Sequence, residues 1–170
     1  MIKAALIATT KELCASAKEK TLAEEFTKCL AIDQIHIMKN YFIPKSDYQQ
    51  VVQTLHLALS EGPELVITTG GTGIGPNDFI PQVLDSNSDY MIAGFGEQIR
   101  REGALSSPKA ALSRCAAYKR GNSLIVALSA GKATREQWAA IRELTLFALG
   151  STRGKCSNRD YKCEARNDFL

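Results

Sequence analysis

The sequence lacks any apolar run long enough to cross a membrane, and its first residues, MIKAALIATTKEL, become polar too soon for a secretory signal. Cysteine is scarce, and the 5 thiols lack the dense, even-numbered spacing of a secreted disulfide scaffold. A net charge of +3, spread along most of the chain, is too small to indicate nucleic acid or an anionic membrane as a partner. We therefore expect a cytoplasmic protein with reduced thiols, no nucleic-acid partner and no membrane partner.

The length and composition indicate one folded domain. A chain of 170 residues with 45% apolar content can bury one compact core and is too short for two ordinary domains. We place this domain at residues 1–150. Residues 151–170 lose the apolar periodicity and gain charge, so we predict a basic C-terminal tail that is disordered or packed on a partner.

Strand-like and helix-like segments alternate along the predicted domain. Short apolar or alternating runs predict strands at residues 3–9, 34–38, 65–68 and 122–128. Apolar stripes at helical spacing predict helices at about 15–32, 46–60, 94–103 and 134–149, the second with a capping box of Ser46 and Gln49. Strands joined by crossover helices pair in parallel, so the expected fold is a three-layer α/β/α domain with a mostly parallel sheet.

The segment TTGGTGIGPND, residues 68–78, is the first candidate for a site because it follows a predicted buried strand. In an open parallel sheet, ligands bind beyond the carboxyl ends of the strands. Glycine permits positive φ and close approach of the backbone, which lets successive N–H groups face an anion. A tight turn without any ligand explains the same glycines, and the cluster alone does not separate the two interpretations.

The two common phosphate motifs do not fit this segment. A Walker loop that starts at Gly70 requires Lys and then Ser or Thr, where the chain has Pro76 and Asn77. A dinucleotide fingerprint that starts at Gly71 meets Pro76 at the place of its third glycine. A phosphate site here would therefore be of another kind.

Asp78 adds a carboxylate three residues after Gly75. Such a carboxylate at the mouth of a pocket lined by N–H groups suits Mg²⁺ held between phosphate oxygens. It also suits the N-cap of a helix that begins near Ile80 and Pro81, because proline is favoured in the first turn. Both roles are compatible with the sequence.

Three motifs in order make the chain similar to the molybdopterin adenylyltransferase family of molybdenum cofactor biosynthesis, the MogA/MoaB type. The first is 68–78 followed by Pro81, the second is AGFGEQIR at 93–100, and the third is LSR at 112–114, with the buried strand LIVAL at 124–128 after it. The resemblance covers about residues 1 to 150. It implies a three-layer α/β fold, usually trimeric or built from trimers, and adenylyl transfer from Mg-ATP to molybdopterin. The implied partners are a pterin, a nucleotide and other enzymes of the same pathway.

Transferred by position, the resemblance gives Asp78 the role of catalytic or Mg²⁺-associated carboxylate, and Asp47 is a second metal-ligand hypothesis. The residues expected to bind phosphate are Thr69, Gly70, Gly71, Thr72 and Gly73. The residues expected at the pterin side, or beside an anionic group of the ligand, are Gly94, Phe95, Gly96, Glu97, Ser113 and Arg114.

The chain departs from the family pattern around these positions. Lys11 and Lys45 replace acidic residues, Asn77 replaces the usual arginine before the aspartate, and the loop 129–132, SAGK, replaces a proline-glycine loop. Lysines remove potential Mg²⁺ ligands and add point charges that hold phosphate directly. The second hypothesis is therefore a molybdopterin-binding or scaffold protein of the same fold with weak or no catalytic activity.

Overall fold

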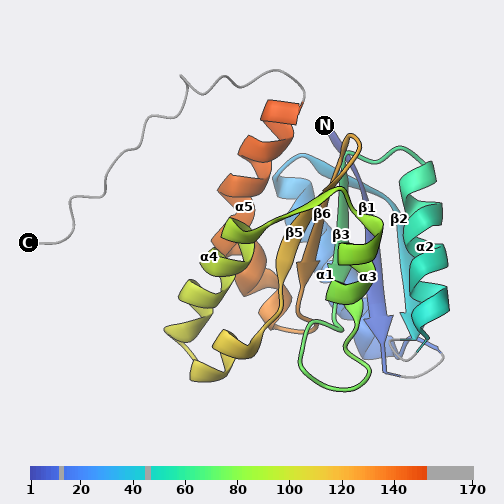
Figure 1. Ribbon diagram of the computed structural model, residues 1–170. Helices are drawn as coiled ribbons and strands as arrows, with labels where there is room; N and C mark the ends of the chain where they lie inside the picture. Colours follow the sequence, from blue (N-terminus) through green and yellow to red (C-terminus); the bar gives the residue numbers. More distant parts are fainter. Residues whose placement is uncertain (12–13, 45–46, 153–170) are drawn as a thin grey trace, which may run out of the picture.

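The computed structural model describes residues 1–11, 14–44 and 47–152 and contains one six-stranded sheet with helices on both faces (Figure 1). The elements in chain order are β1 (Ile2–Thr10), α1 (Ala17–Ile32), β2 (Ile35–Pro44), α2 (Tyr48–Ser60), β3 (Leu65–Thr69), α3 (Ile80–Asn87), β4 (Tyr90–Ile92), α4 (Ala93–Ala104), the 3₁₀ helix η1 (Pro108–Leu112), β5 (Ala116–Arg120), β6 (Ser123–Leu128) and α5 (Ala133–Thr152).

The sheet has the strand order β2-β1-β3-β6-β5-β4. The pairs β1–β2, β1–β3 and β3–β6 are parallel, whereas β5 runs antiparallel to both β6 and β4. The prediction of a mostly parallel sheet is therefore confirmed. Because strands β2, β1, β3 and β6 are parallel, their carboxyl ends lie at the same end of the sheet, and the loops that follow them start there.

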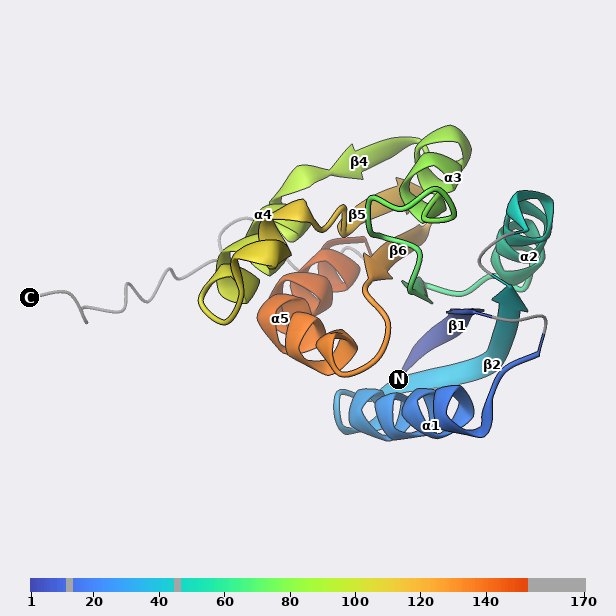
Figure 2. The ribbon, with the colours of Figure 1, turned by 90° about the horizontal axis from the view of Figure 1, so that it is seen from below.

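Two apolar cores separate the three predicted layers. One lies between the sheet and α1, α4 and α5, and it includes Phe26, Phe95 and Trp138. The other lies between the sheet and the pair α2 and α3, and it includes Leu55 and Val83. Figure 2 shows α1 and α5 on one side of the sheet and α2 and α3 on the other. The three-layer α/β/α prediction is confirmed.

Three elements were not predicted from the sequence, and one strand is longer than predicted. Strands β4 and β5 are short, at 3 and 5 residues, and η1 is a single 3₁₀ segment, so none presents a long periodic pattern. Strand β2 continues to Pro44 instead of ending at residue 38, and it stays paired with β1 over this length. The pairing has a bulge, since Ala4 pairs with Ile37 and Ala5 with Lys39. The extra residue between these partners interrupts the alternation on which the prediction depended.

Helices α1 and α2 begin with side-chain caps, and the cap of α2 is not the residue that the sequence predicted. Ser16 and Glu19 form a capping box at α1. The N-cap of α2 is Asp47, whose carboxylate accepts a hydrogen bond from the backbone N–H of Gln50 at 2.9 Å. The predicted box at this helix depended on Ser46, which lies outside the described residues.

Helix α5 closes the larger core, and Trp138 is its central side chain. The Trp138 side chain is 1% exposed, and its ring meets Phe26 of α1 edge to face at a centroid distance of 6.1 Å. Its indole N–H donates to the Asp33 carboxylate at 3.1 Å, and Arg142 donates to the same carboxylate. Thus α5 is tied to the end of α1 by both apolar and polar contacts.

Within the described residues, no helix is long and apolar enough to span a membrane. Helix α5 extends past the predicted domain boundary to Thr152. Most of the predicted tail, from residue 153 onward, lies outside the described residues.

Candidate functional site

The glycine-rich loop begins where β3 ends, at the edge of the sheet that collects the carboxyl ends of the parallel strands. The Thr9 hydroxyl of β1 donates to the Thr69 carbonyl at 3.1 Å, and the Gly70 N–H donates to the Leu128 carbonyl at 2.8 Å. The chain passes from β1 to β2 on one side of β1 and later returns to β3 on the other. The loop therefore lies at the point of the sheet where ligands of open α/β folds bind.

Two glycines of the loop are required by the protein's own packing. Gly70 has φ of +90° and Gly71 has φ of +65°. A Cβ at Gly70 would lie 2.3 Å from the Thr9 hydroxyl oxygen, and a Cβ at Gly71 would lie 2.8 Å from Ile80. The tight turn predicted from the sequence is thus present, and contacts within the protein already require these glycines.

Asp78 folds back onto this loop. Its Oδ2 accepts a hydrogen bond from the Gly75 N–H at 3.0 Å, and a Cβ at Gly73 would lie 2.6 Å from the same oxygen. The N-cap position of α3 is Phe79, without a side-chain cap. The interpretation of Asp78 as the helix cap is therefore wrong, because its carboxylate turns toward the loop and organises the glycines.

Arg114 holds the loop from the other side. Its backbone N–H donates to the Thr72 carbonyl at 2.9 Å, and its Nε donates to the Gly73 carbonyl at 2.7 Å. Its guanidinium also donates to the Asp78 carbonyl. Three contacts from one residue fix the loop at both of its ends, so this guanidinium has a framework role that the sequence did not indicate.

The residues predicted at the start of α4 divide into buried and exposed positions. Phe95 is 5% exposed and belongs to the core, and Gly96 is packed so closely that a Cβ would lie 2.4 Å from the Cys115 carbonyl oxygen. Gly94 and Glu97 are exposed. Arg100, one turn further along, donates to the carbonyls of Ser113 and Cys115 at 3.1 and 3.3 Å. The helix therefore supports the segment that carries Arg114.

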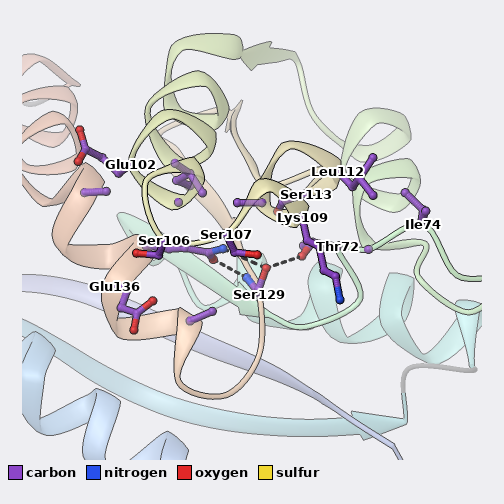
Figure 3. Close-up of a pocket in the computed structure, with 17 residues that line it drawn as sticks. Thr72, Ile74, Glu102, Ser106, Ser107, Lys109, Leu112, Ser113, Ser129 and Glu136 are labelled. Atoms are coloured by element: carbon purple, nitrogen blue, oxygen red, sulfur yellow. Dashed lines mark hydrogen bonds between the residues drawn. The ribbon is translucent and has the colours of Figure 1, made fainter.

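A pocket of about 480 Å³ opens beside the loop, between α4, η1 and the start of α5 (Figure 3). Of the residues predicted from the sequence, Thr72, Gly73 and Ser113 line it. The other lining residues are Ile74, Ile99, Glu102, Gly103, Ser106, Ser107, Lys109, Ala110, Leu112, Ser129, Ala133, Glu136, Gln137 and Ala140. The predicted residues that do not line it are Asp47, Thr69, Gly70, Gly71, Asp78, Gly94, Phe95, Gly96, Glu97 and Arg114.

The inner end of this pocket is a network of small polar groups. Thr72 Oγ1 and Ser129 Oγ are 3.2 Å apart, and the Gln137 side chain contacts Ser129 twice, at 2.7 and 3.0 Å. Cys115, which is buried, lies against them, with its Sγ 3.0 Å from the Ser113 hydroxyl oxygen. Sequence reasoning missed Gln137, which lies on a helix without any motif. The signal for Ser129 was present, because it directly follows the carboxyl end of β6.

The opposite face of the sheet carries a tyrosine with a shifted pKa. Tyr118 of β5 is 2% exposed and packs in the core beneath α2 and α3. Burial, together with the neighbouring Asp85 carboxylate, raises the pKa of Tyr118 to about 12. This phenol therefore stays neutral at physiological pH and serves packing.

The two predicted metal ligands belong to neighbouring elements. Asp47 caps α2, and the next residue, Tyr48, contacts Phe79 with ring centroids 5.3 Å apart, which brings the start of α2 beside the end of the loop. No group of three or more His, Cys, Asp or Glu side chains suited to a metal occurs in the described part of the chain. Lys11 is exposed at the end of β1, and Lys45 lies outside the described residues. A carboxylate that shares Mg²⁺ with substrate phosphates fits this donor set, and a metal held by protein ligands alone does not.

Comparison with known proteins places these features in a family. A family model described as a probable molybdopterin binding domain matches residues 5–145. The molybdopterin adenylyltransferase of Haemophilus influenzae is 36% identical over 115 residues, which are 66% of this chain and 57% of that protein. The chain spans 32% and 25% of two bifunctional molybdenum cofactor biosynthesis proteins that it also matches. It thus covers only part of the length of these curated relatives.

Solved structures show the same architecture. The molybdopterin biosynthesis enzyme MoaB from Thermus thermophilus superimposes with a TM-score of 0.71 at 28% identity, covering 91% of this chain and 98% of that one. A molybdopterin biosynthesis protein from Mycobacterium abscessus superimposes with a TM-score of 0.82 at 22% identity, covering 90% and 97% of the two chains. The second likeness supports the fold alone.

Proposed function

Because this chain belongs to the molybdopterin binding domain family whose model matches residues 5–145, we propose that it acts in molybdenum cofactor biosynthesis and transfers an adenylyl group from Mg-ATP to molybdopterin. The observation that carries the proposal is the junction of the glycine loop with the 480 Å³ pocket at Thr72 and Gly73. A flat pterin fits a pocket of this size with largely apolar walls. The phosphate side of the ligand then lies toward the glycine loop.

In this proposal the chain contributes mainly positioning. The loop between Gly70 and Asp78 is held rigid by Arg114, so its backbone is arranged before a ligand arrives. The Asp78 carboxylate would hold Mg²⁺ together with phosphate oxygens, and the ion would neutralise charge on the phosphate of the transferred adenylyl group and on the departing pyrophosphate. Asp47 is the second carboxylate that we propose for this metal.

The proposal is tested by incubating the purified protein with Mg-ATP and molybdopterin and measuring adenylylated pterin. Asp78→Asn removes the charge and retains an oxygen that accepts the Gly75 N–H, so the loop keeps its shape. We expect turnover to fall by at least about 100-fold in this variant, while pterin affinity stays near that of the wild type. Wild-type protein that makes no product, or an Asp78→Asn variant with full turnover, would refute the proposal.

The role of Asp47 needs its own variant. Asparagine caps a helix as well as aspartate does, so Asp47→Asn keeps the bond to the Gln50 N–H and removes only the charge. If Asp47 holds the metal, the Mg²⁺ concentration for half-maximal turnover rises in this variant while thermal stability is unchanged. An unchanged Mg²⁺ dependence assigns Asp47 to helix capping alone.

A second candidate function is molybdopterin binding without efficient turnover. The observation that favours it is that Arg114 donates to the carbonyls of Gly73 and Asp78, while Lys11 stands exposed at the end of β1. Calorimetry separates the two candidates. Tight binding of molybdopterin with no measurable affinity for Mg-ATP supports the binding protein, and ATP binding that Asp78→Asn abolishes counts against it.

Assembly into a trimer or hexamer is also proposed on the family likeness. Edge strand β4 exposes Tyr90 and Met91, at 59% and 52%, which is compatible with an oligomer contact. Light scattering coupled to gel filtration tests this assembly. A monomer at working concentration would contradict it.

A further inference from the structure

The Gln137 side chain fixes the direction of the hydrogen bonds at the inner end of the pocket. The Ser129 backbone N–H lies 2.7 Å from one terminal atom of the Gln137 amide. A backbone N–H can only donate, so this atom is the amide oxygen and the other is the nitrogen. That nitrogen lies 3.0 Å from Ser129 Oγ and donates to it.

The same direction continues through Ser129 to Thr72. With a hydrogen bond received from Gln137, Ser129 Oγ has its own hydrogen to donate, and two acceptors are in reach. These are Thr72 Oγ1 at 3.2 Å and Cys115 Sγ at 3.5 Å. The hydroxyl oxygen is nearer and is a stronger acceptor than a thiol sulfur. Thr72 therefore receives this hydrogen bond.

The Thr72 hydroxyl hydrogen is then left for a partner outside this network. The Cys115 thiol, whose Sγ lies 3.5 Å from Thr72 Oγ1, donates to this oxygen, and Thr72 lines the pocket although it is only 3% exposed. An oxygen or nitrogen acceptor on a ligand in the pocket can receive the Thr72 hydrogen. Figure 3 shows Ser129 at the junction of the bonds that lead to Thr72.

The surroundings indicate which part of a ligand supplies the acceptor. Ile74, Ile99 and Leu112 give the pocket apolar walls, and two carboxylates, Glu102 and Glu136, line it with one cation, Lys109. This balance disfavours a phosphate inside the pocket and suits the neutral faces of a heterocycle. The acceptor is therefore expected on the ring.

On the basis of the function proposed above, we infer that Gln137 is a positioning residue that makes the Thr72 hydroxyl a hydrogen-bond donor to a ring acceptor of the pterin. It acts through Ser129. The ligand specificity of the pocket then depends on the direction of the two hydrogen bonds that run from Gln137 to Ser129 and from Ser129 to Thr72. A ligand that presents a donor at this place is rejected, because two hydrogens would face each other.

A substitution that reverses the direction of the Ser129–Thr72 hydrogen bond tests the inference and keeps the three residues hydrogen-bonded. In Gln137→Glu the carboxylate accepts from both the Ser129 N–H and the Ser129 hydroxyl, so Ser129 no longer donates to Thr72 and instead accepts from it. We expect molybdopterin to bind about 10-fold more weakly, with an equal rise in its KM and no change in the KM for ATP. Gln137→Leu removes both hydrogen bonds from residue 137 to Ser129 and should weaken molybdopterin binding about 5-fold.

The control for the chemical change is Gln53→Glu, the same substitution at an exposed position of α2, on the other face of the sheet. It should leave both KM values and the affinity unchanged. Thermal unfolding of each variant shows whether the fold is intact. Titrations repeated at high salt separate polarity from charge, since the effect of a charge alone is screened.

The outcomes separate this inference from the proposed function because binding is measured apart from turnover. If the wild type binds molybdopterin but forms no product, the proposed function fails, and the affinities still decide the inference. If Gln137→Glu binds as tightly as the wild type, or its loss disappears at high salt, the inference is overturned. A wild type that does not bind molybdopterin overturns both.

Discussion

The glycine loop 68–78 and the first turns of α4 belong to the same set of motifs, yet they have different surroundings in the folded chain. The loop borders the pocket through Thr72 and Gly73. The α4 segment places Phe95 in the core and presses Gly96 against the backbone at Cys115. The loop borders the pocket with consecutive residues, whereas the α4 motif reaches it only through Ile99 and otherwise packs against the protein.

Two arginines connect these regions in series. Arg100 of α4 donates to the carbonyls of Ser113 and Cys115, and Arg114, between those two residues, donates to the carbonyls of Gly73 and Asp78. The helix holds a segment of chain that in turn holds the loop. Some residues of these motifs thus line the pocket, and others only hold the pocket-lining segments in place. Measurements of stability and of turnover should distinguish these two roles.

The largest effect is expected from Gly96→Ala. The added Cβ would lie 2.4 Å from the Cys115 carbonyl oxygen, so the helix must move away from β5, at a cost of about 3 kcal/mol in the free energy of unfolding. Gly94→Ala is the matched control, since a Cβ there meets nothing within 4 Å and should raise stability by up to about 1 kcal/mol. Urea unfolding measures both. Equal effects at the two glycines would contradict the packing role of Gly96.

The second effect separates the two arginines. Arg114→Met and Arg100→Met each remove charged hydrogen bonds to carbonyls and should each cost about 2 kcal/mol of stability. Only Arg114 holds the loop directly, so Arg114→Met should also lower turnover by about 10-fold or more, while Arg100→Met changes it less. Steady-state kinetics at a temperature where both variants are folded provides the test. Identical turnover in the two variants would contradict the distinction between Arg114, which contacts the loop, and Arg100, which supports it indirectly.

A smaller effect concerns Tyr118, on the far side of the sheet from the pocket. The unfolded chain loses the tyrosine proton near the ordinary pKa of 10.0, and the folded chain, in which the pKa is raised, keeps it to about pH 12. Stability from this group is therefore complete well below pH 10 and declines by about 1 kcal/mol as the pH rises from 10 to 11. Tyr118→Phe should lack that part of the decline. Parallel pH curves for the two proteins would show that burial does not shift this pKa.

The smallest effect is expected at Glu97. Its side chain is exposed and does not line the pocket, so Glu97→Gln should change stability by less than about 0.5 kcal/mol. The family likeness gives this residue a place at the pterin side, and the structure of one chain gives it no contact there. Molybdopterin affinity measured by calorimetry decides between them. An affinity loss of more than about 5-fold would show that Glu97 reaches the ligand.

The sequence predicted the parts of the fold that have long periodic patterns. The helices α1, α2 and α5 and the parallel strands β1, β3 and β6 follow from apolar runs and stripes. The short antiparallel strands β4 and β5 did not, because 3 and 5 residues give too little periodicity and their pairing depends on distant partners.

The candidate site shows the same limit. The position of the loop after β3 followed from the rule for strand ends, and Asp78 was identified as its carboxylate. The bond from Asp78 to the Gly75 N–H, the grip of Arg114 on two carbonyls and the Gln137 network all join residues through tertiary packing. No local pattern encodes such contacts, since each depends on where a distant element settles.

The buried position of Trp138 has a spectroscopic consequence. The chain has a single tryptophan, and its indole is 1% exposed with its N–H bonded to a carboxylate of Asp33. All indole emission therefore comes from one site at the junction of α1 and α5, and its neighbour in sequence is Gln137. Intrinsic tryptophan fluorescence can therefore report the separation of α1 from α5 and the binding of a ligand at the inner end of the pocket, without any attached dye.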